Sequence, residues 1–298
     1  MVRSKRQENR DIRAEAAGMI GRRTLGGTIL ALWVGMVGWH VEREYFVPDA
    51  ARLAEATRHL TPKTHHYVIR EDGGTLGTAS SRVDTLPDGL VLDERMTATI
   101  PLPGGPDRMT SHGRVEVDRS LRLRHFTFEV ESQALTVRSE GEMVGDTLLR
   151  VRTEGDPARH DEIRLDEPPI FQSIIPIRLA MADDLAEGHH VRVPVLEPGA
   201  GEVRPTDVVV DEHRVVALPD SAVRDPETGR WHPTDPDSAD VWRVTEHYGD
   251  LALERWVDEE GRVVRAETPL GFTMERRPMQ LVRQAEEDRR AESKEPAS

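Results

Sequence analysis

The chain has no cysteine, only three lysines (Lys5, Lys63 and Lys294) and a single asparagine, Asn9. Without cysteine it can form no disulfide, no thiolate metal site and no cysteine nucleophile, so core packing alone must hold its folded part together. Lysine and asparagine have AT-rich codons, whereas arginine is abundant here. The composition therefore indicates a GC-rich bacterial genome.

Long apolar runs are also scarce, and one stands out. Residues 24–41 are eighteen consecutive residues without Asp, Glu, Lys or Arg. A helix of that length reaches roughly 27 Å at about 1.5 Å per residue, enough to cross a hydrocarbon core. Residues 1–23 before it carry seven Lys or Arg against three acidic residues. Since basic flanks stay on the cytoplasmic side, we predict a cytoplasmic tail at 1–23 and a single-pass anchor at 24–41 in the inner (cytoplasmic) membrane, with the bulk of the chain extracytoplasmic.

Two alternatives for this apolar run remain open, a cleaved signal peptide and a helix buried in a core. A signal peptide would end its apolar region at a small-x-small site. Here the run continues into bulky and charged residues, Trp39 to Phe46, and the first alanine pair, Ala50-Ala51, comes late. These features favour an uncleaved signal anchor.

The charge balance excludes one class of function. The whole chain carries a net charge of −14, and the tail at 1–23 is positive by four, which leaves −18 for the rest. Nucleic-acid binding requires a basic footprint, so we expect no nucleic-acid partner. The acidic surface is explained by solubility.

The region after the anchor is predicted to be mainly β. Seven runs between 66 and 155 have strand character and are separated by turns such as Asp72-Gly73-Gly74 and Pro87-Asp88-Gly89, which predicts an antiparallel meander. Strand-like runs return between 190 and 277, around a Pro/Asp/Ser-rich stretch, 219–240, that is typical of an exposed, mobile loop. We predict a helical stalk at 42–62, a β domain at 63–277 and a tail at 278–298 that is helical, then disordered.

One apolar segment, IFQSIIPIRLAMADDL at 170–185, interrupts the strands. Pro168, Pro169 and Pro176 prevent one long helix, so we predict a short kinked helix, mostly Ile177 to Leu185, covering one face of the sheet. The simplest interpretation is plain core. The competing hypothesis is that Phe171, Ile174, Ile175 and Leu179 line an apolar cavity that a lipid or a partner segment can enter.

The order of these elements resembles the non-catalytic region that precedes transglutaminase-like domains in membrane-anchored bacterial proteins. The resemblance rests on GTLGTASSRVDTLPDGLVLDERM, IIPIRLA, LAEGHHVRVPVLEPG and ERWVDEEGRVVRAETPLGFTMER, and covers about residues 63–277. More loosely, the chain is similar to half-barrel domains related to periplasmic lipoprotein carriers. The resemblance implies a curled antiparallel sheet, half-barrel-like, with the apolar helix on its concave face, and an envelope location. It implies no activity, because the transglutaminase nucleophile is missing.

No constellation for catalysis, metals or cofactors is evident. Ser80 and Ser81 are not in a nucleophile-elbow pattern and are predicted to face solvent. The adjacent pairs His65-His66 and His189-His190 would point to opposite faces of a strand, so neither can chelate as a unit. We therefore predict no enzyme, no cofactor and no metal. The expected function is a membrane-anchored accessory or binding module of the envelope, whose partner is another envelope protein or a lipid. The alternatives are an apolar-ligand (lipid) binding half-barrel and, from another class, a hydrolase without a recognisable motif.

Overall fold

The structure, a computed structural model, describes residues 49–102, 105–133, 136–154, 158–249, 251–268 and 271–292. The predicted cytoplasmic tail and anchor, together with residues 42–48 of the predicted stalk, lie outside the described residues. Among the residues that are described, no helix combines the length and the apolar character needed to cross a bilayer. The compact unit that contains the sheet begins at Asp49.

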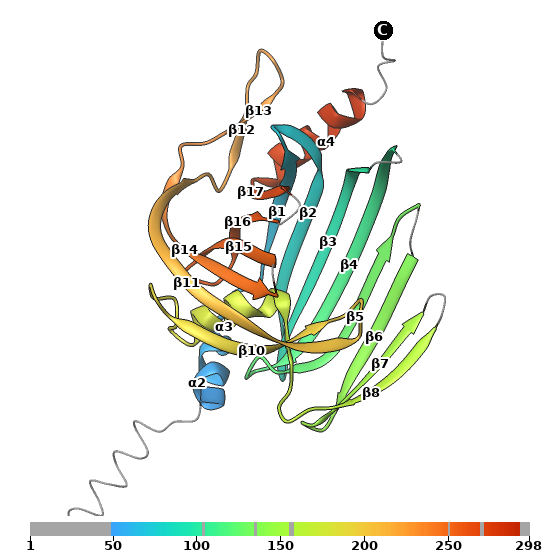
Figure 1. Ribbon diagram of the computed structural model, residues 1–298. Helices are drawn as coiled ribbons and strands as arrows, with labels where there is room; N and C mark the ends of the chain where they lie inside the picture. The colour runs from blue at the N-terminus through green and yellow to red at the C-terminus, as the bar shows by residue number, and fades with distance from the viewer. Residues whose placement is uncertain are drawn as a thin grey trace, which may run out of the picture. The chain divides into compact units, whose positions relative to one another are not determined.

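A curled sheet dominates this unit (Figure 1). Fifteen described strands follow one another in the order β8-β7-β6-β5-β4-β3-β2-β1-β17-β16-β15-β14-β11-β10-β9. Their bounds are β1 Lys63–Glu71, β2 Gly74–Leu86, β3 Gly89–Leu102, β4 Gly105–Asp118, β5 Leu123–Glu131, β6 Thr136–Val144, β7 Leu148–Glu154, β8 Arg159–Arg164, β9 Ile170–Phe171, β10 His190–Glu197, β11 Glu202–Leu218, β14 Asp237–Tyr248, β15 Leu251–Asp258, β16 Val263–Glu267 and β17 Thr273–Arg277. The prediction of a mainly β, curled sheet is confirmed.

The sheet consists of two meanders joined at a single seam. Strands β1 to β8 form the first. Strands β9 to β11 and β14 to β17 form the second, which is antiparallel throughout except that β9 pairs in parallel with β10. At the seam, β1 lies antiparallel to β17, with His66 opposite Arg277 and Arg70 opposite Thr273. The first and last strands of the sheet-forming chain are therefore neighbours.

Alternation of side chains places the core on the concave face. In β7, Leu149 and Val151 are buried while Arg150 and Arg152 are exposed, the period of two that a half-buried strand requires. Phe126 of β5 joins the same core cluster with no exposed surface. The apolar side chains of successive strands thus meet inside the curl.

The helix before the sheet is part of the folded domain. Helix α2, Asp49–Ala56, continues into a 3-10 turn, η1, Thr57–His59. Leu53 and Leu60 are buried in the main core, and the hydroxyl of Thr57 donates to the carbonyl oxygen of Arg119 at 2.9 Å. The described part of the predicted stalk is therefore packed on the domain, because its apolar side chains find partners there.

The apolar segment forms its helix earlier than predicted. A 3-10 turn, η2 (Gln172–Ile174), leads into α3 (Ile175–Met181), whereas the sequence predicted Ile177 to Leu185. Pro176 fits the first turn of α3, where its missing N–H has no intrahelical partner to lose. The helix ends because Asp183 adopts a left-handed conformation, with φ of 63°.

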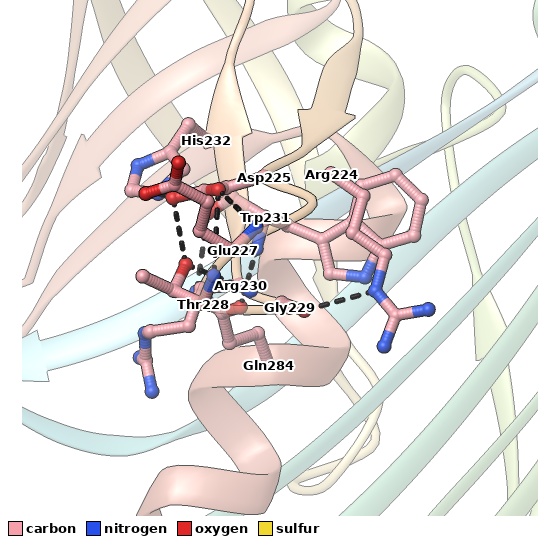
Figure 2. A network of polar contacts seen from close by, with 9 residues as sticks. All are labelled: Arg224, Asp225, Glu227, Thr228, Gly229, Arg230, Trp231, His232 and Gln284. Carbon is pink, nitrogen blue, oxygen red and sulfur yellow. Dashed lines mark hydrogen bonds and ion pairs between the residues drawn. The ribbon is translucent and has the colours of Figure 1, made fainter.

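The stretch predicted as a mobile loop, 219–240, contains an ordered hairpin. Strands β12 (Ala222–Arg224) and β13 (Trp231–Pro233) pair with each other and lie against the last helix, α4 (Met279–Glu292). Figure 2 shows the contact: the amide of Gln284 accepts from the backbone N–H of Trp231 at 2.7 Å and donates to its carbonyl oxygen at 3.2 Å. The stretch is exposed as predicted, but it is not irregular throughout, because the hairpin contacts a segment more than fifty residues away.

Candidate functional site

A cavity of about 710 Å³ lies inside the curled sheet. Alternate residues of each strand point into it, as expected where one face of a sheet is buried. Both meanders contribute to its wall, so the curl brings β10 and β15 across from β1 to β4. Most of the lining is apolar, including Ile69, Leu92, Met96, Ile100, Val195 and Leu253.

The apolar segment covers part of this cavity, but only some of its side chains reach the wall. Phe171, one of the four predicted cavity residues, lines it together with Ile177. The other three, Ile174, Ile175 and Leu179, are buried in the core cluster and are not among the lining residues. Gly199, an exposed residue of the β10–β11 turn, also lines the cavity, which therefore reaches the protein surface there.

An acidic side chain, Glu94, stands in the apolar wall. It follows Leu90 and Leu92 in the same phase of β3, so the strand turns its carboxyl group inward. The hydroxyl of Ser173, from η2, donates a hydrogen bond to it, and Ser81 of β2 donates another. Burial disfavours the ionised form and raises the pKa of Glu94 above its usual value, although these two hydroxyls oppose the shift.

A buried ion pair lies beside the cavity, with its cation, Arg255, in the lining. The guanidinium of Arg255 on β15 is 3.2 Å from the carboxylate of Glu246 on β14, which has no exposed surface. The hydroxyl of Tyr248 donates to the same carboxylate at 2.6 Å, and the side-chain amide of Gln172 donates to it at 3.3 Å. Arg255 also donates to the backbone carbonyl oxygen of Gln172 at 3.3 Å. This network ties the apolar segment at 170–185, here called the cover segment, to the second meander.

His65 is buried at the seam and is held neutral. Its Nδ1 accepts from the guanidinium of Arg276 at 3.4 Å, and Arg276 in turn is 2.8 Å from Asp258. Burial, together with the neighbouring positive charges of Arg276 and Arg262, lowers the pKa of His65 to about 3. His66 is half-buried on the other face of β1, so the two histidines do not act as a pair.

Ser81 lies between His65 and Glu94 across three adjacent strands, and it lines the cavity rather than facing solvent as predicted. The arrangement differs from a catalytic triad, in which the histidine stands between the hydroxyl and the acid. Here Glu94 bonds the serine directly. A histidine with a pKa of about 3 is also too weak a base to take a serine proton at neutral pH.

A second hollow, of about 410 Å³, lies over β5 to β8 and is lined mainly by polar and charged side chains such as His125, Arg150 and Glu162. Within the described ranges, no group of three or more His, Asp or Glu side chains is arranged to hold a metal ion. The apolar cavity is thus the better candidate site.

The polar cavity residues Glu94, Tyr248 and Arg255, and the buried Glu246 bonded to the last two, were not predicted from the sequence. One signal could have revealed Glu94: in GLVLDERMTATI it occupies the same alternating phase as Leu90, Leu92 and Met96. A charge in an apolar phase indicates either a bulge or a buried polar site. The Glu246–Arg255 pair offers no comparable signal, because its partners become neighbours only in the folded sheet.

Comparisons with known proteins support the fold. No protein-family model matches the chain, and no curated protein sequence is detectably similar to it. A crystal structure of a β-barrel-like protein of the domain of unknown function DUF1849, from Brucella abortus, covers 74% of this chain and 97% of its own, with a TM-score of 0.50 and 16% identity. A DUF1089 family protein from Pseudomonas aeruginosa covers 64% of this chain and 89% of its own, with a TM-score of 0.36 and 14% identity.

The first likeness shows that this chain has a β-barrel-like fold. The second is too weak to add to that assignment. The resemblance to the region preceding transglutaminase-like domains is not tested by these comparisons and stays a prediction.

Proposed function

We propose that this protein is a non-enzymatic binding module of the bacterial envelope whose curled sheet encloses the apolar part of a small amphiphilic ligand. The observation that carries the proposal is the cavity: its volume of about 710 Å³ falls within the range of roughly 300–1,000 Å³ typical of ligand pockets. Its mainly apolar wall, with a few convergent polar groups, has the composition expected of such a pocket.

The cover segment gives such a ligand a way to be held. Phe171 and Ile177 of the cover segment form part of the cavity wall. The backbone carbonyl oxygen of Gln172 accepts a hydrogen bond from Arg255 of the second meander. A ligand inside would therefore contact both meanders and the cover segment at once. The order of Ser81, His65 and Glu94 supports binding rather than hydrolysis, which is the alternative from another functional class.

Attachment to the membrane is a second part of the proposal and rests on the apolar run at 24–41 and its basic flank. Such an anchor would keep the domain beside the outer surface of the inner membrane, close to lipids and to other envelope proteins that it could assist. Protease added to spheroplasts should digest the chain beyond residue 42. Protection of that region would reverse the proposed orientation, and a mature form lacking residues 1–40 would identify a cleaved signal instead.

Binding is tested by filling the cavity. Ala79 lines it, so Ala79→Trp should occupy the space that a ligand needs. A matched control is Val215→Trp, which adds the same ring at a side chain that is 62% exposed. We expect the full-length chain and the control variant to bind an environment-sensitive fatty-acyl probe, and Ala79→Trp to lose this binding while unfolding at a similar temperature. Equal probe binding by all three proteins, or none by the full-length chain, would contradict the proposal.

A further inference from the structure

The cations around the cavity each have an acidic partner. The four pairs are Arg255 with Glu246 at 3.2 Å, Arg276 with Asp258 at 2.8 Å, Arg95 with Asp93 at 3.1 Å and Arg262 with Glu260 at 3.7 Å. These contacts balance the positive charges one by one.

Among the described residues that line the cavity, the acidic residue Glu94 differs from these pairs because it has no oppositely charged partner. Its two hydrogen-bond donors, Ser173 and Ser81, are neutral hydroxyl groups, and no described cation lies within ion-pair distance of it. Arg255 is near enough to lower the pKa of Glu94 somewhat, but its guanidinium is bonded to Glu246 and to the carbonyl oxygen of Gln172. Its charge is therefore already compensated.

The other acidic residue of the lining, Glu197, is a useful contrast. It lies near the exposed β10–β11 turn, and its carboxylate is 3.5 Å from the guanidinium of Arg204. An unpaired carboxylate away from water is destabilised by the loss of its hydration, whereas one at the rim is screened by solvent. Of these two acidic residues, the ones that the described lining contains, Glu94 thus combines enclosure in apolar surroundings with the lack of a cation partner.

We infer that Glu94 binds the polar end of the ligand, and that this end is a positively charged hydrogen-bond donor, a primary ammonium group attached to an apolar chain. The inference rests on the proposed function, because the chain must occupy the cavity for the ammonium group to reach Glu94. Ser173 and Ser81 occupy part of the lone-pair capacity of the carboxylate and leave the rest for the ligand. An ammonium group supplies both the missing charge and the missing donor.

The test compares three ligands that share one chain: decylammonium, decanol and decanoate, each below its micellar concentration. Displacement of a fluorescent acyl probe is measured on the full-length chain held in an amphipol, with the amphipol alone as the blank. We expect decylammonium to bind at least about tenfold more tightly than decanoate, the factor that one charge-assisted hydrogen bond provides. This comparison on the wild-type chain does not depend on the folding of any variant.

Variants then locate the preference. Glu94→Gln should remove it, and Glu94→Asp, which keeps the charge, should retain most of it. Because the whole chain is acidic, Glu129→Gln serves as the matched control: Glu129 is an exposed residue of β5 outside the cavity lining, so the change alters the net charge equally but should leave the preference intact. Loss of the preference in both glutamine variants would show general attraction of cations and overturn the inference.

The outcomes separate the inference from the proposed function. If decanol and decanoate bind as tightly as decylammonium, the cavity takes apolar chains but Glu94 does not select the head group, so the inference fails alone. If none of the three displaces the probe, and the probe itself does not bind, both the binding function and the inference fail.

Discussion

Gly261, in the turn between β15 and β16, packs directly against Pro176 of α3. A Cβ added to Gly261 would lie 2.3 Å from the carbonyl oxygen of Pro176, far inside van der Waals contact. The glycine also has a φ of +71°, the left-handed region that other residues rarely adopt. The turn itself is shaped by Asp258, whose carboxylate accepts from the backbone N–H groups of Glu260 and Arg262. The contact between Gly261 and Pro176 thus packs the β15–β16 turn against α3, the helix that covers part of the cavity.

Gly261→Ala should therefore destabilise the domain in two ways. The left-handed conformation costs roughly 1 to 2 kcal/mol for a residue with a Cβ, and overpacking against backbone adds roughly 1 to 3 kcal/mol. Gly73→Ala is the matched control, because Gly73 has a φ of +83° but nothing within 4 Å of the added Cβ. Urea unfolding should show the larger loss for Gly261→Ala. Equal losses would mean that α3 moves away from the turn at little cost.

The buried pair of Arg255 and Glu246 should be strongly coupled. Arg255→Met leaves Glu246 as an uncompensated charge and should cost about 3–5 kcal/mol of unfolding free energy. The double variant, Arg255→Met with Glu246→Leu, should cost much less than the sum of the single changes, since it removes both charges. Chemical denaturation of the four proteins measures this coupling. Additive losses would contradict it.

His65 should make the domain less stable in acid. Its pKa is about 3 in the folded chain and 6.5 in the unfolded one, so between these values the unfolded state binds more protons. The stability that neutral His65 provides is complete above pH 6.5 and is lost as the pH falls towards 3, by at most about 1.4 kcal/mol per pH unit.

The measurement is the difference in unfolding free energy between wild type and His65→Phe at pH 7 and at pH 5. Relative to wild type, the variant should gain stability at the lower pH, because phenylalanine takes up no proton. Glu94 acts in the opposite direction, since its pKa is raised, and it is present in both proteins. A difference that does not change with pH would show that His65 titrates normally in the folded chain.

The hairpin of β12 and β13 should depend on Gln284. The Gln284 side chain accepts a hydrogen bond from the backbone N–H of Trp231 and donates one to its carbonyl oxygen. Gln284→Ala should therefore loosen the hairpin without unfolding the sheet. Gln280→Ala on the same helix is the control, because the Gln280 side chain has no hydrogen bond to another described residue. Hydrogen exchange should become faster in 222–233 in the first variant only. Faster exchange across the whole sheet would mean that the hairpin is part of the cooperative unit.

The strands of the first meander were predictable because their polar and apolar residues alternate and glycine turns separate them. Strand β8, Arg159–Arg164, was missed, since RHDEIR has one apolar residue and its strand state depends on pairing with β7. Such a charged edge strand is a known protection against further pairing. The helix α2 was expected from its sequence, but its docking through Leu53 was not, because local pattern does not report what a helix packs against.

The candidate site was predictable only in outline. The density of apolar residues in the segment around Phe171 indicated a cover or a core, and the structure divides it between both roles: Phe171 lines the cavity and Ile174 is buried in the core. Whether a side chain points to a cavity or to a packed interior depends on the opposing wall. That wall comes from strands about eighty residues away in sequence, such as those carrying Glu94 and Arg255.

The seam between β1 and β17 has a consequence for how the protein is made. Residues 66–70 must wait for residues 273–277 before they can pair, a separation of about two hundred positions along the chain. Closing so long a loop is slow, whereas the hairpins of the first meander form from near neighbours. During synthesis, therefore, a ribosome must deliver the chain as far as residue 277 before β1 and β17 can pair and enclose Glu94 and Arg255 together. Truncated or stalled chains would expose the apolar face of an incomplete sheet, which makes them targets for chaperones and proteases rather than partly active products.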